Sequence, residues 1–408
     1  MKIVALLNSY VQGVSGGDSR FVEIMKRITK SGGVTNLTIV TSKLGMLFCE
    51  KRGLEAVYKL TTREDTVRNT ALLYLHRLIA GILINLKVEK GTILYSSSHF
   101  LPDVIAACFL KHRGRRVTWV QTVFHIIPTP VLREGNYVTN FLSYSSQMIS
   151  LELIKRNSDL LFVLNDQVKG YLVETGFPEC RIHVVGAGIN LSQIDAIQGL
   201  DSPVYDACFL GRLHRAKGVF DLLEIWKMVV SKINGAKLAM VITGSEETEL
   251  ALKRKIQKEN LANNIFMLNL SGEDALRVMK SSKVFVFPSH EEGWGIAATE
   301  AMACGLPVIA YDLPVYKEIF GKSIATVAVK DTQSFSKEII KLLENESYRA
   351  TLGKKGRIKV LAYDWLRVAS RELSIMQRAL MKTSENDERT AALIPTRVCT
   401  LEPKETIC

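Results

Sequence analysis

Short apolar runs that alternate with longer amphipathic stretches extend from the first residues of this sequence to about residue 365. An apolar run of four to eight residues bounded by turn residues is typical of a buried parallel strand, and the stretches between have helical spacing. The pattern therefore predicts an α/β chain built from repeated strand–helix units. The expected strands are 2–7, 37–41, 92–95, 117–120, 160–163, 205–210, 237–242, 265–268, 284–287 and 308–311.

These strands form two series separated by residues 186–204, where Gly, Asn, Ser, Asp and Pro interrupt the pattern. A length of 408 residues favours two domains, at about 100 to 200 residues per domain. Two doubly wound halves would bind a ligand between them, at the carboxyl ends of both sheets. The expected parts are a first Rossmann-like domain, a linker, a second Rossmann-like domain, a terminal helix and a disordered tail, at 1–190, 191–203, 204–365, 366–382 and 383–408.

An excess of basic residues, 53 Lys and Arg against 41 Asp and Glu, gives a net charge of +12 and favours anionic partners. Phosphorylated ligands, acidic lipid surfaces and nucleic acid all fit this charge. The seven cysteines include no C-x-x-C pair, which indicates reduced thiols and a cytoplasmic chain.

The most apolar long stretch, residues 71–86, is shorter than the roughly 20 residues that span a bilayer. We therefore expect no transmembrane helix. A core or interdomain helix is the favoured interpretation of this stretch, and a membrane-docking helix is the alternative, because both carry apolar residues at helical spacing.

A glycine turn follows the first expected strand, with Gly16 and Gly17 just before Asp18. Glycine allows the backbone to approach a ligand closely, and the free amides at a helix start favour an anion. The turn is not a G-x-G-x-x-G fingerprint, and no acidic residue follows the second strand where a dinucleotide ribose would need one.

A basic loop follows the strand at 205–210, where Arg212, His214, Arg215 and Lys217 lie close together. Arginine can bind two phosphate oxygens at once and lysine supplies a point charge, so this loop suits a diphosphate. A solvated basic turn is the alternative interpretation of the loop alone.

Two carboxylates, Glu292 and Glu300, lie eight residues apart with Gly295 between them. We expect Glu292 on a loop above the sheet and Glu300 in the first turn of the next helix, so that they bind different hydroxyl groups of one ligand. The small side chains of Ala297 and Ala298 leave the amides at the helix start open to phosphate oxygens.

The E-x7-E motif from Glu292 to Glu300, the basic segment 211–218 and the turn around Gly244 resemble the retaining nucleotide-sugar glycosyltransferases of family 4, the group 1 glycosyltransferases. That family has the GT-B fold, in which two Rossmann-like doubly wound domains face each other across a cleft. The resemblance extends to about Arg378 and is strongest in the second half of the chain.

By this resemblance, Arg212 and Lys217 would hold the donor diphosphate, Glu300 the ribose hydroxyls and Glu292 the transferred sugar. His125, which follows a strand of the first domain, would lie against the donor sugar. The remaining contacts to the nucleotide sugar would come from Gly16, Gly17, Gly244, Gly295, Ala297 and Ala298.

The resemblance implies a retaining hexosyltransferase that moves a hexose-type sugar from a nucleotide-diphosphate donor to a hydroxyl acceptor, in polysaccharide biosynthesis at the cell surface or in glycolipid synthesis. The departing diphosphate would help to deprotonate the acceptor, with no metal or cofactor, and the sequence contains no Asp-x-Asp pair. The implied partners are the nucleotide sugar and a glycan or lipid-linked acceptor. Peripheral contact with an anionic membrane at its cytoplasmic face would involve residues 71–86 and the basic run 111–116.

Other functions stay open at this point. Sugar-nucleotide epimerases and glycan phosphorylases use the same pair of domains, and a product with a new glycosidic bond would distinguish a transferase from them. A non-catalytic basic module that binds anions or nucleic acid is another alternative, although no aromatic residue interrupts the run 111–116, so no nucleic acid partner is expected. No motif in the sequence identifies the base of the donor or the acceptor.

Overall fold

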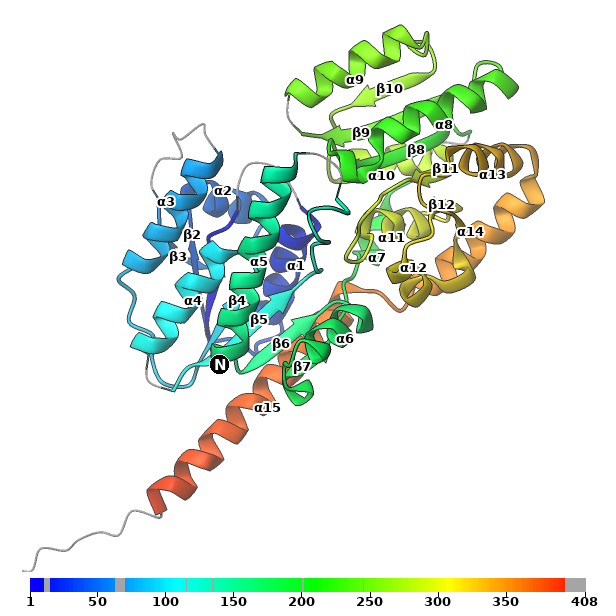
Figure 1. Cartoon of the computed structure of the whole chain (residues 1–408). Coiled ribbons are helices and arrows are strands. Elements are labelled where there is room, and N and C mark those ends of the chain that lie inside the picture. Colours follow the sequence, from blue (N-terminus) through cyan, green and yellow to red (C-terminus); the bar gives the residue numbers. More distant parts are fainter. Residues whose placement is uncertain are drawn as a thin grey trace, which may run out of the picture.

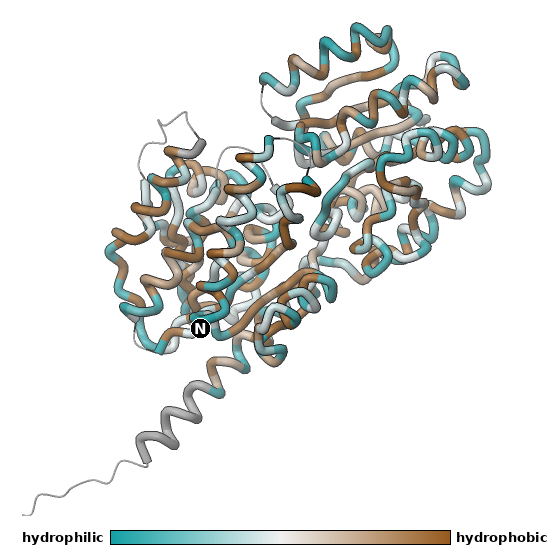
Figure 2. Tube along the Cα trace, viewed as in Figure 1, coloured by the Kyte–Doolittle hydropathy of each residue, from teal (hydrophilic) through white to brown (hydrophobic). Residues whose placement is uncertain are grey.

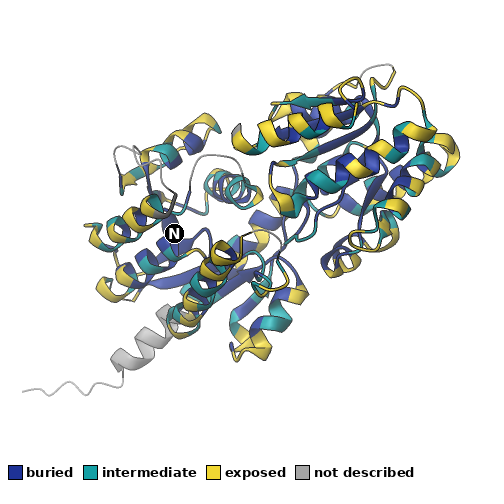
Figure 3. Cartoon of the chain, turned by 45° about the horizontal axis from the view of Figure 1, so that its top comes forward, coloured by how far each residue is buried: buried dark blue, intermediate teal, exposed yellow. Residues whose placement is uncertain are grey.

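The chain forms two parallel sheets with helices on both faces of each, arranged as two domains (Figure 1). The structure is a computed structural model, and it describes residues 1–10, 15–62, 70–114, 116–133, 136–199, 202–244 and 246–392. In Figure 3 the strands are mostly buried, and the exposed positions lie mainly on the outer faces of the helices. Strands covered on both faces explain the continuous apolar runs of the sequence.

The first sheet has the strand order β3-β2-β1-β4-β5-β6-β7, and all neighbouring strands are parallel. The order reverses between β1 and β4, as in doubly wound folds. Its strands are β1 (Lys2–Leu7), β2 (Asn36–Thr41), β3 (Val57–Leu60), β4 (Thr92–Ser96), β5 (Thr118–Val123), β6 (Leu160–Val163) and β7 (Ile182–Val184). The helices between them are α1 (Gly16–Lys30), α2 (Lys43–Lys51), α3 (Thr70–Leu83), α4 (Leu101–Arg113), α5 (Tyr137–Asn157) and α6 (Asp166–Glu174).

The second sheet has the order β10-β9-β8-β11-β12-β13, again with all neighbours parallel, and it reverses between β8 and β11. Its strands are β8 (Tyr205–Arg212), β9 (Leu238–Thr243), β10 (Ile265–Leu268), β11 (Ser282–Phe287), β12 (Val308–Tyr311) and β13 (Ala325–Val327). The helices are α8 (Val219–Lys232), α9 (Glu246–Lys258), α10 (Glu273–Lys280), α11 (Ile296–Ala303), α12 (Pro314–Ile319), α13 (Thr332–Glu344) and α14 (Glu346–Val360).

Every strand expected from the sequence is present, with ends that differ by no more than three residues. The sequence pattern missed β3, β7 and β13, which all lie at edges of their sheets. Edge strands are exposed on one side, and β3 has three exposed residues among its four. Such strands lack the continuous apolar run by which the central strands are recognised.

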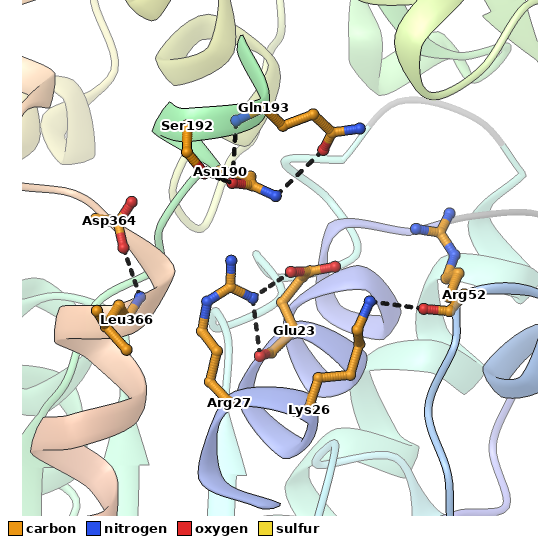
Figure 4. A network of polar contacts seen from close by, with 9 residues as sticks. All are labelled: Glu23, Lys26, Arg27, Arg52, Asn190, Ser192, Gln193, Asp364 and Leu366. Carbon is orange, nitrogen blue, oxygen red and sulfur yellow. Dashed lines mark hydrogen bonds and ion pairs between the residues drawn. The ribbon is translucent and has the colours of Figure 1, made fainter. Parts of the chain in front are cut away.

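The chain passes between the domains twice, and the two connections lie side by side. The amide of Ile189 donates to Tyr363 O at 2.9 Å, and the amide of Trp365 donates to Ile189 O at 3.1 Å. Figure 4 shows Asn190 accepting from the amide of Gln193 at the start of α7 (Leu191–Ala196), which occupies part of the expected linker 191–203.

The last helix, α15 (Trp365–Ala392), returns to the first domain and packs against α1. Its Glu372 forms a fully buried ion pair with Arg20 of α1 and accepts a hydrogen bond from Tyr95 Oη at 3.0 Å. The helix also extends further than expected. The prediction of a disordered tail from residue 383 is wrong for residues 383–392, which belong to α15. The sequence pattern ended earlier because apolar periodicity marks the packed face of a helix and not its full length. Residues 393–408 lie outside the described chain.

The favoured interpretation of residues 71–86 as a core or interdomain helix is also wrong. These residues form most of α3, which lies on the outside of the first domain next to α4 (Figure 1). Its apolar side chains at Leu72, Leu75, Ile79 and Leu83 are exposed. In the described part of the chain, no helix is long and apolar enough to span a membrane.

Candidate active site

Two loops of the second domain, one after β8 and one after β11, are fixed side by side. The amide of His290 donates to Ala216 O at 2.8 Å. Gly218 has a φ of +67°, and a Cβ there would lie 1.9 Å from Pro288 O, so only glycine allows this contact. Because β8 and β11 are adjacent parallel strands, their carboxyl ends bring both loops to the same edge of the sheet.

A partly buried polar contact also holds the Glu292 loop against α8. Asp221 of α8 accepts a hydrogen bond from Tyr311 Oη at 2.8 Å, and its Oδ2 lies 2.9 Å from His290 Nε2. Burial alone would raise the pKa of Asp221, but the hydrogen bonds from His290 and Tyr311 lower it below its usual value. An ionised Asp221 therefore links α8 to the loop that follows β11.

These contacts bring Lys217 and Glu292 together as an ion pair between Lys217 Nζ and Glu292 Oε1. Only 19% and 10% of the two side chains are exposed, so solvent screens this pair less than a surface pair. Arg212, at the end of β8, is exposed and has no carboxylate within ion-pair distance among the described residues. Burial raises the pKa of Asp18 in the first domain, and the positive charge of Arg212 acts against that rise.

Helix α11 starts at a glycine turn. Gly295 has a φ of +95°, and a Cβ there would lie 3.2 Å from Tyr316 Cε1. The first intrahelical bond runs from the amide of Thr299 to Gly295 O, so the amides of residues 296–298 precede it. Ala297 is partly exposed, but Ala298 is fully buried and can offer a ligand only its amide.

Glu300 lies in the second turn of α11, so its expected place in the first turn is wrong. The helix begins at Ile296, directly after Gly295, and Glu300 is its fifth residue. Burial raises the pKa of the Glu300 carboxyl to about 7, and the charge of Arg52 from the first domain acts against that rise. Glu300 is thus partly protonated near neutral pH.

The first domain places the start of α1 opposite the start of α11. A Cβ on Gly16, the first residue of α1, would lie 3.1 Å from Ile296 Cδ1, and one on Gly17 would lie 2.6 Å from Phe124 Cε2. Ser15 caps this helix, because its Oγ accepts from the amide of Asp18 at 3.1 Å. The starts of two helices therefore lie next to each other, and helix N-termini favour an anionic group.

His125, which follows β5, lies against the Glu292 loop. A Cβ on Gly293 would lie 3.2 Å from His125 Cβ and 2.7 Å from Phe124 O. Burial lowers the pKa of His125, while the neighbouring Glu291 acts in the opposite direction and Lys217 adds to the lowering. The structure thus brings His125, Lys217 and Glu292 together at the junction.

Gly244 lies beside the basic loop that carries Arg212 and Lys217. A Cβ there would lie 2.6 Å from Leu213 Cβ, so the glycine lets the turn after β9 pack against the basic loop. The neighbouring Ser245 lies outside the described residues. In the described ranges, no group of three or more His, Cys, Asp or Glu residues could hold a metal ion.

Sequence reasoning missed the contacts that join the domains around this group. Arg133 Nε donates to Glu291 Oε2 at 3.1 Å, and Arg133 Nη2 donates to Glu291 Oε1 at 2.5 Å. Asn165 Nδ2 donates to Gly293 O at 2.8 Å. Glu291 was visible beside Glu292 in the sequence, but Arg133 lies in a connection without a motif, so nothing there pointed to the pair.

Comparison with known proteins shows what the chain is similar to. Residues 192–359 match the family model described as "Glycosyl transferases group 1". The capsular polysaccharide biosynthesis glycosyltransferase CapM of Staphylococcus aureus is 30% identical over 179 residues, which cover 43% of this chain and 47% of that protein. The chain thus spans about half the length of that relative.

Two further proteins extend the comparison. The GDP-mannose:cellobiosyl-diphosphopolyprenol alpha-mannosyltransferase of Xanthomonas campestris is 24% identical over 266 residues, 63% of this chain and 69% of that protein. The crystal structure of Anabaena Alr3699/HepE in complex with UDP and glucose superposes with a TM-score of 0.71 at 15% identity, over 93% of this chain and all of that one. The chain therefore has the GT-B fold, and residues 192–359 in its carboxyl-terminal half match the group 1 glycosyltransferases.

Proposed function

We propose that this chain is a retaining glycosyltransferase that moves a hexose-type sugar from a nucleotide-diphosphate donor to a hydroxyl acceptor. The observation that carries the proposal is the Lys217–Glu292 ion pair, which lies beside His125 where the starts of α1 and α11 face each other. This site offers positive charge for phosphate and a carboxylate for sugar hydroxyls within contact of each other.

In this proposal the second domain holds the donor. Arg212, Lys217 and the amides of residues 296–298 bind the diphosphate, and Glu300 accepts hydrogen bonds from the ribose hydroxyls. Glu292 accepts from the hydroxyls of the transferred sugar. Lys217 already contacts Glu292. Its ammonium group can therefore bind the Glu292 carboxylate and a phosphate oxygen of the donor at the same time, without a large movement.

In the transfer step the acceptor oxygen attacks the anomeric carbon from the face that the diphosphate leaves. A new glycosidic bond forms as the bond from the anomeric carbon to the diphosphate oxygen breaks, and the hydroxyl proton passes to that oxygen. Arg212 and Lys217 stabilise the negative charge that develops on the leaving group. The lowered pKa of His125 keeps its imidazole neutral at pH 7, so it can both donate to and accept from the sugar.

The proposed reaction needs no metal ion or cofactor, because two cations and two helix N-termini supply the positive charge at the diphosphate. The rate should therefore be unchanged when EDTA is added. Loss of activity in EDTA that magnesium restores would contradict this part of the proposal.

We place the reaction in cell-surface polysaccharide or glycolipid synthesis at the cytoplasmic face of the membrane. Support comes from the described roles of two relatives, one in capsular polysaccharide biosynthesis and one acting on a diphosphopolyprenol. The second candidate is a sugar-nucleotide epimerase or glycan phosphorylase on the same fold, and the product distinguishes them.

The first experiment is a thermal-shift screen of nucleoside diphosphates with the full chain. A ligand at a hundred times its dissociation constant stabilises the folded state by about 2.7 kcal/mol, so the preferred base should give a clear shift. The matching nucleotide sugars are then tested for slow transfer to water and for transfer to candidate acceptors, with the anomeric configuration read by NMR. Retention is expected, and an epimer or a sugar phosphate would support the second candidate instead.

The variant Glu292→Gln separates binding from transfer. It should keep the fold and the thermal shift with the nucleoside diphosphate but lose at least about 10²-fold in turnover, because the neutral amide binds the transferred sugar and Lys217 less strongly. Glu273→Gln, an exposed acid on α10, is the matched control and should behave as wild type. Full turnover by Glu292→Gln would contradict the proposed role of this residue.

A further inference from the structure

Trp294 supplies the only side chain between Glu292 and Ile296, because both of its neighbours, Gly293 and Gly295, are glycines. Glycine allows the backbone many conformations, so this short segment has little stiffness of its own. The Trp294 side chain is nevertheless buried, with only 7% of the residue exposed. The position of the segment therefore depends on what this one side chain contacts and on the hydrogen bonds of the backbone beside it.

The indole of Trp294 packs against the first of the two connections between the domains, at Gly186. This glycine has a φ of +78°, and a Cβ there would lie 3.2 Å from Trp294 Cη2, so both the backbone conformation and the close contact favour glycine. Gly186 O accepts a hydrogen bond from Arg20 Nε at 3.1 Å, and Arg20 forms the buried ion pair with Glu372. The backbone on which the indole packs is thus held by α1 of the first domain.

The indole also contacts the second connection between the domains, through Tyr363. The centroids of the two rings lie 5.1 Å apart at an interplanar angle of 79°, an edge-to-face arrangement that aromatic pairs prefer. Tyr363 Oη donates to Ile319 O of α12 at 2.7 Å, which links this ring to the second domain. Trp294 therefore lies against both connections, which are joined to each other by the backbone hydrogen bonds of Ile189.

The buried hydrophobic residues around Trp294 belong to one continuous cluster that extends into both domains. The cluster includes Val185, Ala187 and Ile189 of the first connection and Trp365 at the end of the second. Figure 2 shows hydrophobic stretches on both sides of the place where the domains join. Trp294 Nε1 is buried and has no hydrogen-bond partner among the described residues, so the burial of this side chain serves packing alone.

A hydrogen bond from the first domain holds the backbone just before the indole. Asn165 Nδ2 donates to Gly293 O at 2.8 Å. Asn165 Oδ1 caps α6 by accepting from the amide of Val168 at 2.8 Å. Because Asn165 is fully buried and both ends of its carboxamide are bound, the side chain has one orientation. The segment is thus held by a hydrogen bond at Gly293 and by packing at Trp294.

We propose that Trp294 and Asn165 are positioning residues that hold the Glu292 carboxylate in place for sugar transfer. This inference rests on the proposed function. Glu292 directly precedes the segment, and its carboxylate pairs with Lys217. Without the indole, the residues after Glu292 would sample several backbone conformations, and the carboxylate would move with them. Lys217 and Arg212 belong to a different loop, so binding of the diphosphate should not depend on Trp294.

The variant Trp294→Ala tests the indole contact in the full chain. Its kcat for transfer from the preferred nucleotide sugar should fall by about 10²-fold, because a misplacement of about 1 Å at a reacting group has an effect of this size. Its affinity for the nucleoside diphosphate, measured by calorimetry, should stay close to that of the wild type. The matched control is Leu342→Ala, which opens a cavity at a fully buried leucine of α13 and should bind and transfer as wild type below its unfolding temperature.

The conservative variant Trp294→Phe distinguishes positioning from a general loss of stability. A phenyl ring keeps the aromatic contact with Tyr363, and its introduction breaks no hydrogen bond of the described residues. Transfer should therefore return to within about threefold of the wild-type rate, as expected when packing and not the indole N–H holds the segment. The unfolding temperature of each variant without ligand shows that the assays are run on folded protein.

The variant Asn165→Asp tests the hydrogen bond separately. Aspartate retains the oxygen that caps α6 but cannot donate to Gly293 O. Transfer should fall by about tenfold, the effect of one unpaired buried polar group, while the affinity for the nucleoside diphosphate stays unchanged. The matched control Asn345→Asp makes the same change at the residue that caps α14 and should behave as wild type. Because both residues act on one segment, the double variant Trp294→Ala/Asn165→Asp should lose less than the product of the two single losses.

Three outcomes would overturn the inference for Trp294. These are a wild-type rate of transfer by Trp294→Ala, an equal loss of nucleotide affinity and transfer in that variant, and a Trp294→Phe variant that is as slow as Trp294→Ala. A wild-type protein that epimerises the donor sugar or forms a sugar phosphate would overturn the proposed function instead. The same variants compared in that reaction would still test whether Trp294 positions Glu292.

Discussion

The two sides of the domain junction are built in different ways. The second domain supplies Lys217, Glu292 and the first amides of α11 from two loops that are fixed against each other by a glycine contact and by hydrogen bonds. The first domain supplies Gly16, His125 and Asn165 from connections after three different strands. The second side therefore holds its charged groups by contacts within one domain, whereas the first side meets them through contacts between the domains.

This difference teaches where substitutions should act most strongly. A charge held rigidly at a developing anion contributes to the transition state directly, whereas a contact that joins the domains changes how often the complete site is formed.

The largest effect is expected for Lys217→Ala. Removing one preorganised group that stabilises developing charge costs about 10² to 10³ in turnover. The substitution also leaves Glu292, with only 10% of its side chain exposed, without its cation. Single-turnover transfer from the preferred nucleotide sugar measures the loss, and Lys258→Ala on the exposed end of α9 is the control. If Lys217→Ala turns over substrate at close to the wild-type rate, the charged groups of the second domain do not contribute more to turnover than the contacts of the first domain.

A smaller effect is expected for the contact between the domains. Arg133→Ala and Glu291→Ala should each lower kcat/KM by about tenfold, the effect of losing a bidentate charge-assisted pair worth one to two kcal/mol. If the two residues act only through each other, the double variant should be no worse than either single one. Losses that multiply in the double variant would show that Arg133 or Glu291 touches substrate independently.

Much of the second side could be predicted from the sequence because its parts are local. Arg212 and Lys217 belong to one loop, and Glu292 and Gly295 to another, each directly after a strand with a continuous apolar run. Adjacent parallel strands then bring the two loops together without further information. The contact of Lys217 with Glu292 itself depends on side-chain packing and was not expected.

The rest could not be predicted, for physical reasons visible at two places. Apolar spacing in α3 identified a helix with an apolar face but not the direction of that face, which is set by the burial of Arg77 against Asn8. The pair of Arg133 and Glu291 joins residues 158 positions apart in the sequence. Neither contact leaves a periodic or local signal in the chain.

The smallest predicted effect concerns the pH dependence of donor binding at Glu300. Its pKa of about 7 is raised above the value of about 4.3 for an exposed Glu, because burial disfavours the ionised form. The ionised carboxylate is the stronger acceptor for ribose hydroxyls. Affinity for an intact nucleotide sugar should therefore increase as pH rises through 7, by up to about tenfold between pH 6 and pH 8, as the ionised fraction grows.

The variant Glu300→Gln distinguishes this role from a structural one, because binding and stability should change in opposite directions. A raised pKa in the folded state means that Glu300 favours folding while protonated, and this contribution is lost as pH rises through about 7. At pH 8 the glutamine variant should bind the nucleotide sugar more weakly, with no remaining pH dependence, yet unfold at a higher temperature than wild type. An intact nucleotide sugar is used because a free diphosphate has its own ionisation near this pH. A wild-type affinity that stays constant from pH 6 to pH 8 would remove Glu300 from the donor site and leave the second side of the junction with a single functional carboxylate.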